Sequence, residues 1–401
     1  MKLTILMPCL DEAETIEACV KAAKAWIDRS GISAEVLVAD NGSTDGSQAL
    51  ARAAGARVVE VPDKGYGSAL FAGTLAAQGG YLVMGDADGS YDFGHLEPFI
   101  QKLDEGCDLV MGNRFQGGID PGAMPLKSRY FGNPFLSLVA RLLFKTPVGD
   151  IQCGLRAYTK AAFFRMDLRS MGMEYASEMV IKAATKGLRI GETPTTLVKD
   201  GRSRPPHLRP FRDGWRNLRF MLLFSPRWLF TVPSALVALG SLAAYLRLLA
   251  GPLTVGAVTF DYHTMLFAQA GILLGFLGLV FGVLLRLIGI REGLLGANPA
   301  LERLNRSYML EAGALLGGLA ILGGALSGLA LLGRWGQRGF GPLGPEEMLR
   351  QVSFASLLVV GGGVVLCASL LIGFIGIPTR EARLRQGAEL SQPAERELAG
   401  A

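Results

Sequence analysis

The stretch Tyr81-Leu82-Val83-Met84-Gly85-Asp86-Ala87-Asp88 joins a short apolar run to a pair of carboxylates. An apolar run followed by glycine is typical of a buried strand that ends in a loop. Two ionised carboxylates so close together repel each other. Both can therefore face the same point only if a cation there neutralises their charge. Such hard oxygen ligands suit Mg²⁺ or Mn²⁺ bridging a diphosphate. Surface turns also contain Asp-x-Asp pairs, so the surrounding pattern has to decide between a metal site and a turn.

The strand over 81–84 belongs to a longer alternation of apolar runs and helical spacing. Further strands are predicted over residues 3–7, 35–39, 57–61 and 109–111, and helices over 12–27, 44–54, 68–78 and 96–103. This alternation predicts an α/β domain with a mostly parallel sheet and helices on both faces. Ligands of such sheets bind at the carboxyl ends of the strands. Four polar clusters follow predicted strands: Asp11-Glu12, Asp40–Ser43, Lys64-Gly65 and Asp86–Asp88.

Charged residues are distributed unevenly along the 401 residues. The segment from Thr231 to Thr379 holds 14 charged residues in 149, whereas the other 252 residues hold 61. Buried core helices are nearer about 10–14 residues long, and a membrane span needs ~20 apolar residues. Four stretches without charge are long enough to span: Trp228–Leu246, Tyr262–Leu285, Ala312–Gly333 and Gln351–Thr379. We therefore predict an all-α transmembrane domain of four helices over residues 228–379, followed by a tail over 380–401.

Small residues recur within these stretches. Gly271 and Gly275, like Gly313 and Gly317, stand four residues apart, a spacing that lets helix backbones approach closely. Packing inside the four-helix bundle is the simpler interpretation, and a homo-oligomer contact is the alternative.

A basic segment precedes the first apolar stretch. Eight basic and two acidic residues lie between Lys199 and Arg227, whereas the whole chain has a net charge of +5. Nucleic acid could bind such a cluster, but its position favours a membrane surface, where each basic residue gains about 1 kcal/mol near anionic lipid. Arginines and apolar residues both recur at helical spacing over residues 211–227, which predicts an interfacial amphipathic helix. We expect no nucleic-acid partner.

The arginine distribution also predicts the orientation in the membrane. Arginines precede the first span, follow the second and begin the tail, and such residues concentrate on the cytoplasmic side. We therefore expect the first domain and both termini to be cytoplasmic, in a multi-pass protein of a bacterial inner membrane. The five cysteines contain no Cys-x-x-Cys pair, and Met1–Leu10 lacks the apolar core of a signal peptide, as suits a cytosolic domain.

Two loops at the predicted strand ends suggest ligand contacts. In Asp40-Asn41-Gly42-Ser43-Thr44, Ser43 or Thr44 is the expected helix N-cap, and the Asp40 carboxylate is able to accept the imide N–H of a uracil. Lys64-Gly65 offers a cation beside flexible backbone, which suits a phosphate. It is not a Walker loop, because the spacing and the Ser/Thr are missing.

Together these motifs resemble those of family 2 glycosyltransferases with the GT-A fold, and most of all the polyprenyl-phosphate hexose synthases of the dolichol-phosphate mannose and glucose synthase type. Five ordered motifs carry the resemblance: Met7–Glu12, Asp40–Gly46, Lys64–Gly67, Gly85–Asp88 and Asp150–Arg156. It implies a GT-A domain over residues 1–210. It also implies transfer of a hexose, with inversion, from a nucleotide sugar, expected to be a UDP-sugar, to a polyprenyl phosphate.

The resemblance places roles on particular positions. Asp86 and Asp88 would hold Mg²⁺ or Mn²⁺, although Ser90 stands where these synthases often carry a metal-binding Gln. The nucleotide-sugar pocket would comprise Pro8, Leu10, Asp11, Glu12, Asp40, Asn41, Gly42, Lys64, Gly65, Asp86, Ala87 and Asp88. The residues expected to be catalytic are Asp88, Asp150, Arg156 and Glu178.

An ionised lipid phosphate needs positioning rather than deprotonation, because its second pKa is about 6. Arginine forks match its oxygens, and the arginines expected at the acceptor are Arg114, Arg129, Arg156, Arg202 and Arg204. Transfer to a lipid hydroxyl, as in diacylglycerol glycolipid synthesis, is the alternative, and it would require a base such as Asp150 or Glu178. A non-catalytic membrane scaffold or flippase is the alternative from another class, and the Asp86/Asp88 pair argues against it.

Overall fold

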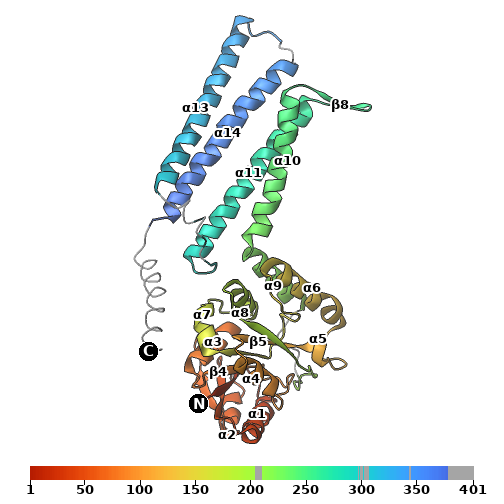
Figure 1. Cartoon of the computed structure of the whole chain (residues 1–401), viewed down its shortest axis with the longest axis vertical. Helices are drawn as coiled ribbons and strands as arrows, with labels where there is room; N and C mark the ends of the chain where they lie inside the picture. Colours follow the sequence, from red (N-terminus) through yellow and green to blue (C-terminus); the bar gives the residue numbers. More distant parts are fainter. Residues whose placement is uncertain (204–209, 297, 299–300, 302–306, 343–344, 378–401) are drawn as a thin grey trace. The chain divides into compact units, whose positions relative to one another are not determined.

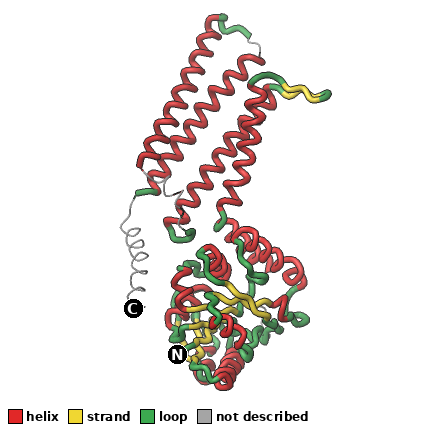
Figure 2. The backbone as a smooth tube through the Cα atoms, in the orientation of Figure 1, coloured by secondary structure: helices red, strands yellow, loops and turns green. Residues whose placement is uncertain are grey.

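The computed structural model describes residues 1–203, 210–296, 298, 301, 307–342 and 345–377. The chain divides into two compact units, Met1–Leu223 and Phe224–Ala401. The first contains the larger sheet and the second is almost entirely helical (Figures 1 and 2).

A seven-stranded sheet organises the first unit, in the order β3-β2-β1-β4-β6-β5-β7. The predicted strands are β1 (Leu3–Cys9), β2 (Ala34–Asp40), β3 (Arg57–Glu60), β4 (Tyr81–Met84) and β5 (Leu109–Asn113). β6 (Arg156–Thr159) and β7 (Ile190–Pro194) were not predicted. β6 runs antiparallel to β4 and β5, and the other neighbouring pairs are parallel. The predicted α/β fold with a mostly parallel sheet is confirmed.

Helices surround this sheet, whose strands are yellow in Figure 2. They are α1 (Ile16–Ser30), α2 (Ser47–Ala53), α3 (Tyr66–Ala76), α4 (Glu97–Asp104), α5 (Arg114–Gly117), α6 (Asn133–Phe144), α7 (Lys160–Met166), α8 (Glu174–Thr185) and α9 (Pro210–Leu223), with a π-helical turn over Ser128–Gly132. α1 buries Ile16, Val20, Ala23 and Trp26, which lie on one face at helical spacing. It ends at Gly31, whose φ of 66° is the left-handed conformation that glycine adopts without strain.

Two boundaries differ from the sequence-based expectation. The helix predicted from Thr44 begins at Ser47 after Gly46, so Ser43 and Thr44 are not its N-cap. Residues 43 and 44 instead form a loop whose N–H groups donate to Asp40 and Asp11. The basic helix predicted over 211–227 is α9, which ends at Leu223 and packs on α6 and α8 within the first unit.

The described residues of the second unit form four long apolar helices: α10 (Val232–Leu249), α11 (Tyr262–Arg291), α13 (Ser307–Gln337) and α14 (Pro345–Ile375). The helical segments long and apolar enough to cross a membrane are Arg227–Leu249, Tyr262–Arg291, Leu310–Gln337 and Met348–Ile375. The predicted four-helix transmembrane domain is therefore confirmed. A short hairpin, β8 (Leu253–Val255) and β9 (Val258–Phe260), joins α10 to α11 and was not predicted.

The helix glycines serve contacts inside this unit. A Cβ at Gly275 would lie 2.6 Å from the backbone nitrogen of Ala238 on α10. A Cβ at Gly317 would lie 2.8 Å from the carbonyl oxygen of Gly362 on α14. Glycine therefore allows α11 to approach α10, and α13 to approach α14, at backbone distance.

Candidate active site

A pocket of about 630 Å³ lies at the carboxyl ends of β1, β2 and β4. Nine of the residues predicted for nucleotide-sugar binding line it: Pro8, Leu10, Glu12, Asn41, Lys64, Gly65, Asp86, Ala87 and Asp88. Cys9, Tyr66, Ala69, Met171, Gly172, Met173, Arg202 and Arg216 line it as well. Parallel strands bring these loops together because their carboxyl ends share one edge of the sheet.

Asp86 lies in the pocket wall and accepts a hydrogen bond of 2.9 Å from the Tyr66 hydroxyl. Burial, followed by the charge of Asp88, raises the pKa of the Asp86 carboxyl to about 6. A Cβ at Gly154 would lie only 2.5 Å from Asp86 Oδ2, so a larger residue there would displace the carboxylate. The Asp-x-Asp pair thus forms part of a built pocket rather than an exposed turn.

Asp88 is held from two sides. Its Oδ1 accepts hydrogen bonds from the Ser90 hydroxyl at 2.6 Å and the Ser90 amide at 3.0 Å. Its Oδ2 lies 2.8 Å from Nη2 of Arg202. Ser90 stands where the synthases that this sequence resembles often carry a metal-binding Gln. Here it holds the Asp88 carboxylate in place by hydrogen bonds.

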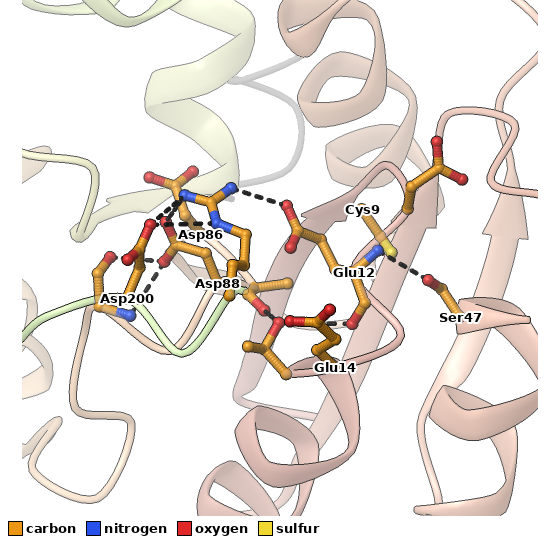
Figure 3. A network of polar contacts seen from close by, with 12 residues as sticks. Cys9, Glu12, Glu14, Ser47, Asp86, Asp88 and Asp200 are labelled. Carbon is orange, nitrogen blue, oxygen red and sulfur yellow. Dashed lines mark hydrogen bonds and ion pairs between the residues drawn. The ribbon is translucent and has the colours of Figure 1, made fainter. Parts of the chain in front are cut away.

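Arg202 connects three carboxylates at this end of the pocket. Besides Asp88, its guanidinium contacts Glu12 at 3.1 Å and Asp200 at 3.1 Å. Figure 3 shows Glu12, Asp88 and Asp200 gathered around this group. Arg202 was expected at the acceptor, but in this arrangement it lies with the carboxylates of the nucleotide-sugar pocket.

The carboxylate pair fits a divalent cation in the chemistry of its donors. In the part of the chain that the structure describes, no group of three or more His, Cys, Asp or Glu side chains is arranged to bind a metal ion. Asp86 and Asp88 would be the protein's ligands, and oxygens of a diphosphate and water would supply the others, as is usual for Mg²⁺. A cation there would also relieve the repulsion that contributes to the raised pKa of Asp86.

Asn41 ties the end of β2 to the loop before α3. Its Oδ1 accepts from the Gly65 amide at 2.7 Å, and its carbonyl oxygen accepts from Lys64 Nζ at 2.8 Å. Gly65 has φ 135°, and a Cβ there would lie 2.2 Å from the carbonyl oxygen of Met171. The Lys64 ammonium is thereby fixed beside the pocket.

Three residues predicted for the nucleotide pocket do not line it. They make contacts within and between the neighbouring loops instead. Asp40 is 1% exposed and accepts from the amides of Gly42 and Ser43 and from Gln48 Nε2. Its Oδ2 is engaged by the loop, whereas Oδ1 has only the Ser43 amide at 3.4 Å, so the contact with a uracil stays a prediction. Gly42 lies against Lys64, and Asp11 accepts from the Thr44 amide at 2.8 Å while lining a smaller adjoining pocket.

Asp150 was expected to act on the acceptor, but it is fully buried against Arg114. Its two oxygens accept from Nε of Arg114 at 2.7 Å and from Nη2 at 2.8 Å. The same two bonds occupy the Nε and Nη2 donors of the Arg114 guanidinium, and the Arg114 side chain is only 7% exposed. Neither residue lines the 630 Å³ pocket. The geometry gives both a structural role and supports neither as a contact of the acceptor.

Glu178 and Arg156 are also fully buried. Glu178 accepts from the amides of Arg169 and Ser170 and lies 2.9 Å from Lys182 Nζ, so it anchors the loop before α8. Arg156 donates to the carbonyl oxygens of Ala176 and Cys153. A group so enclosed does not reach a substrate, which removes the support for catalytic roles at these two positions.

Of the two remaining arginines predicted at the acceptor, only Arg129 is described, and it does not line the pocket. Arg129 is partly buried, donates to the Ile119 carbonyl oxygen at 3.2 Å and lies over the Tyr130 ring. Arg204 lies outside the described residues.

Sequence reasoning missed one wall of the pocket. Met171, Gly172 and Met173 come from the loop before α8, and Arg216 comes from α9. Arg216 pairs with Glu174 through Nε and Nη2, the latter at 2.8 Å from Oε2. The helical spacing of Arg212, Arg216 and Arg219 indicated a single membrane-facing stripe, and nothing local distinguishes the middle arginine.

Comparison with known proteins agrees with this arrangement. Residues 4–166 match the family model described as glycosyl transferase family 2. Residues 283–376 match the model of the glycosyltransferase family 2 C-terminal transmembrane region. The chain is also 35% identical to the low-salt glycan biosynthesis hexosyltransferase Agl6 of Haloferax volcanii, over 93% of this chain and 89% of that protein. The chain belongs to glycosyl transferase family 2.

It is therefore a glycosyltransferase with a GT-A domain and an integral membrane domain. A dolichyl-phosphate hexose transferase of Haloferax volcanii is 30% identical, over 53% of this chain and 89% of that protein. In structure, the chain is similar to glucosyl-3-phosphoglycerate synthase from Mycobacterium tuberculosis in complex with Mn²⁺, uridine diphosphate and phosphoglyceric acid. That likeness covers 55% of this chain and 76% of that one, with 22% identity and a TM-score of 0.41.

Proposed function

We propose that this glycosyltransferase moves a hexose from a nucleotide sugar to the phosphate of a polyprenyl lipid, at the cytoplasmic face of the membrane. One observation carries the proposal. A single pocket contains the Asp86/Asp88 pair, suited to a metal-bound diphosphate, and Arg216, a guanidinium on the helix just before the first span. A phosphate acceptor anchored in a bilayer needs a cation at such a position.

The donor half of the pocket consists of the loops after β1, β2 and β4. Asp86 and Asp88 would hold Mg²⁺ or Mn²⁺, which neutralises charge on the leaving diphosphate when bound. Lys64 contributes a second positive charge near the strand ends. The preference for uracil rests on Asp40, whose Oδ2 is bound by its own loop and whose Oδ1 has one contact at 3.4 Å, and this contact alone does not select the base. The proposal therefore covers UDP- and GDP-hexoses.

The acceptor half consists of Arg216 and the loop with Met171 and Met173. Glu174 takes two of the five guanidinium N–H donors of Arg216, so a phosphate can bind without breaking that ion pair. The two methionines give the same wall an apolar character that suits the first isoprene units. The name of the dolichyl-phosphate hexose transferase relative supports this choice of acceptor.

The reaction needs no strong base. One phosphate oxygen attacks the anomeric carbon as the bond from that carbon to the nucleoside diphosphate breaks, which inverts the configuration. The attacking oxygen carries no proton to remove, because a phosphate monoester is largely ionised at pH 7. The burial of Asp150 and Glu178 in ion pairs agrees with this chemistry and disfavours transfer to a hydroxyl, which would require such a base.

The test is product formation by the purified full-length chain. Labelled UDP- and GDP-hexoses are supplied with Mn²⁺ or Mg²⁺ and a short polyprenyl phosphate, and the organic phase is assayed for label. We expect label in a lipid-phosphate sugar and its loss in Asp88→Asn. A panel that yields no organic-soluble product would overturn the proposal.

A further inference from the structure

A second cavity lies in the helical unit. The proposed transfer reaction does not involve it. It has a volume of about 620 Å³ and is lined from α10, α13 and α14. Its apolar wall includes Leu249, Leu331 and Phe354, and its charged side chains are Arg334 and Arg350. Among the described residues that line it, none is acidic. The cavity thus combines two positive charges with a wall suited to hydrocarbon.

Arg350 is held in a fixed position at this cavity. Its Nη2 lies 2.5 Å from Oδ1 of Asp261, and its side chain is 20% exposed. Its Nε is fully buried and, in the described part of the chain, meets no hydrogen-bond acceptor. The buried Nε lies out of reach of a ligand in the cavity, so a ligand oxygen would have to contact the terminal guanidinium nitrogens. Asp261 orients the guanidinium through Nη2 and leaves Nη1 for such a contact.

The depth of the two arginines matches a lipid headgroup. Arg334 lies near the end of the span Leu310–Gln337, and Arg350 lies near the start of the span Met348–Ile375. Arginine at such positions reaches the interfacial layer, where lipid phosphates lie. The apolar lining residue Leu249 is the last residue of α10. The cavity is thus at the end of α10 remote from the link to the first unit.

The interior of the unit has further polar contacts close to this cavity. The Tyr245 hydroxyl lies 3.2 Å from the Ser353 hydroxyl, which donates to Gln269 Oε1 at 2.6 Å. These bonds connect α10, α11 and α14, so the α14 segment that carries Arg350 is fixed to its neighbours. Two of the three helices that line the cavity, α10 and α14, are therefore bonded to each other near it.

We propose that this cavity binds the phosphate headgroup of a lipid from the leaflet opposite the one where α10 begins. Arg334 and the Nη1 of Arg350 would contact phosphate oxygens, which guanidinium forks match well. The first carbons of the lipid chain would lie against Leu331 and Phe354. The site is independent of the transfer reaction, and its ligand is either an anionic glycerophospholipid or a polyprenyl-linked phosphate.

Native mass spectrometry of the detergent-solubilised full-length chain tests this site. The probes are phosphatidylglycerol, a short polyprenyl phosphate and, as a lipid without phosphate, diacylglycerol. We expect one retained phosphate lipid, and retention about tenfold or more weaker in Arg334→Gln and in Arg350→Lys. Arg350→Lys keeps a positive charge for Asp261 and removes the second terminal nitrogen of the guanidinium, so it separates ligand binding from folding. The stronger of the two phosphate probes identifies the source of the ligand.

Arg247→Gln is the matched control, because Arg247 is an exposed arginine near the end of α10 that does not line the cavity. Its lipid retention should equal that of the unmodified chain. The proposal is overturned if diacylglycerol is retained as well as the phosphate lipids. It is equally overturned if Arg334→Gln and Arg350→Lys bind as tightly as the Arg247→Gln control.

Discussion

At the scale of single residues, the decisive question about each carboxylate is what neutralises it. Asp86 and Asp88 lie in an open pocket, whereas Asp150 and Glu178 are enclosed with Arg114 and Lys182. A sequence displays all four as acidic side chains. It does not show that Asp150 pairs with an arginine 36 residues away, or that Glu178 and its neighbour Lys182 are both buried. This is why the metal pair was predictable and the expected acceptor-side carboxylates were not supported.

The Asp150–Arg114 pair yields a stability prediction. Asp150→Asn leaves Arg114 as a buried charge without its bidentate partner, so we expect a loss of about 3–5 kcal/mol in the free energy of unfolding. Thermal unfolding of the detergent-solubilised chain measures this. The exposed Asp28→Asn provides the control, with a change of about 0.5 kcal/mol or less.

If Asp150 were instead a catalytic base, Asp150→Asn would behave differently. The variant would unfold at the normal temperature while its turnover per folded molecule collapsed. That result would contradict the structural role and revive transfer to a hydroxyl acceptor.

Arg216 yields a prediction about substrate affinity. Arg216→Gln removes a charged donor from the acceptor wall, which is worth about 1.5–3 kcal/mol, or roughly 10- to 100-fold. We expect the KM for polyprenyl phosphate to rise by that factor, with little change in the KM for the sugar nucleotide. Steady-state kinetics with each substrate varied in turn measures both values.

The control for Arg216 lies one helical turn along α9. Arg219 is exposed and is not among the pocket residues, so Arg219→Gln should leave both KM values unchanged. Equal acceptor effects in the two variants would mean that α9 acts only through its general positive charge, against a specific role of Arg216.

At the scale of elements, the parallel strands explain how much of the pocket was predictable. β1, β2 and β4 read as apolar runs. The register places Pro8 of β1 beside Ala39 of β2, and Leu6 of β1 beside Met84 of β4, so the polar residues that follow must converge. β6 was missed because Arg156-Ala157-Tyr158-Thr159 offers no apolar run, and its arginine is buried through bonds to backbone carbonyls. The wall from Met171 to Met173 and Arg216 depends on contacts between distant segments, for which the sequence has no periodic signal.

The close contact of two loops at Gly65 leads to a further prediction. Gly65→Ala introduces a Cβ 2.2 Å from the Met171 carbonyl oxygen at φ 135°, a backbone conformation almost confined to glycine. The loop before α3 and the loop before α8 must then separate. We expect a rise in KM for both substrates, measured by the same kinetics, because Lys64 and the Met171 wall would both shift.

Gly46→Ala is the matched control for Gly65→Ala. Gly46 has φ 90°, and a Cβ there would meet no atom within 4 Å of it in the described structure. The Gly46→Ala substitution therefore carries only the conformational cost of a side chain at positive φ, about 1–2 kcal/mol. If Gly46→Ala impaired both KM values as strongly as Gly65→Ala, the effect would arise from backbone strain and not from the contact between loops.

At the scale of the whole molecule, charge distribution explains the two units. The charge-poor segment after Thr231 forms the four apolar helices, and the charged residues before it form the sheet domain. Composition alone therefore predicts where the membrane domain begins. It does not predict that α9 belongs to the first unit, because its arginines resemble a membrane-surface stripe while Arg216 contributes to the pocket.

The central claim is that the acceptor is a phosphate and not a hydroxyl. The most direct measurement supplies the purified full-length chain with one labelled nucleotide hexose and two acceptors that differ only in the phosphate: a polyprenyl phosphate and the corresponding polyprenol. We predict that label enters the organic phase with the polyprenyl phosphate alone, with one nucleoside diphosphate released per hexose transferred. Equal or preferential transfer to the polyprenol would contradict the account.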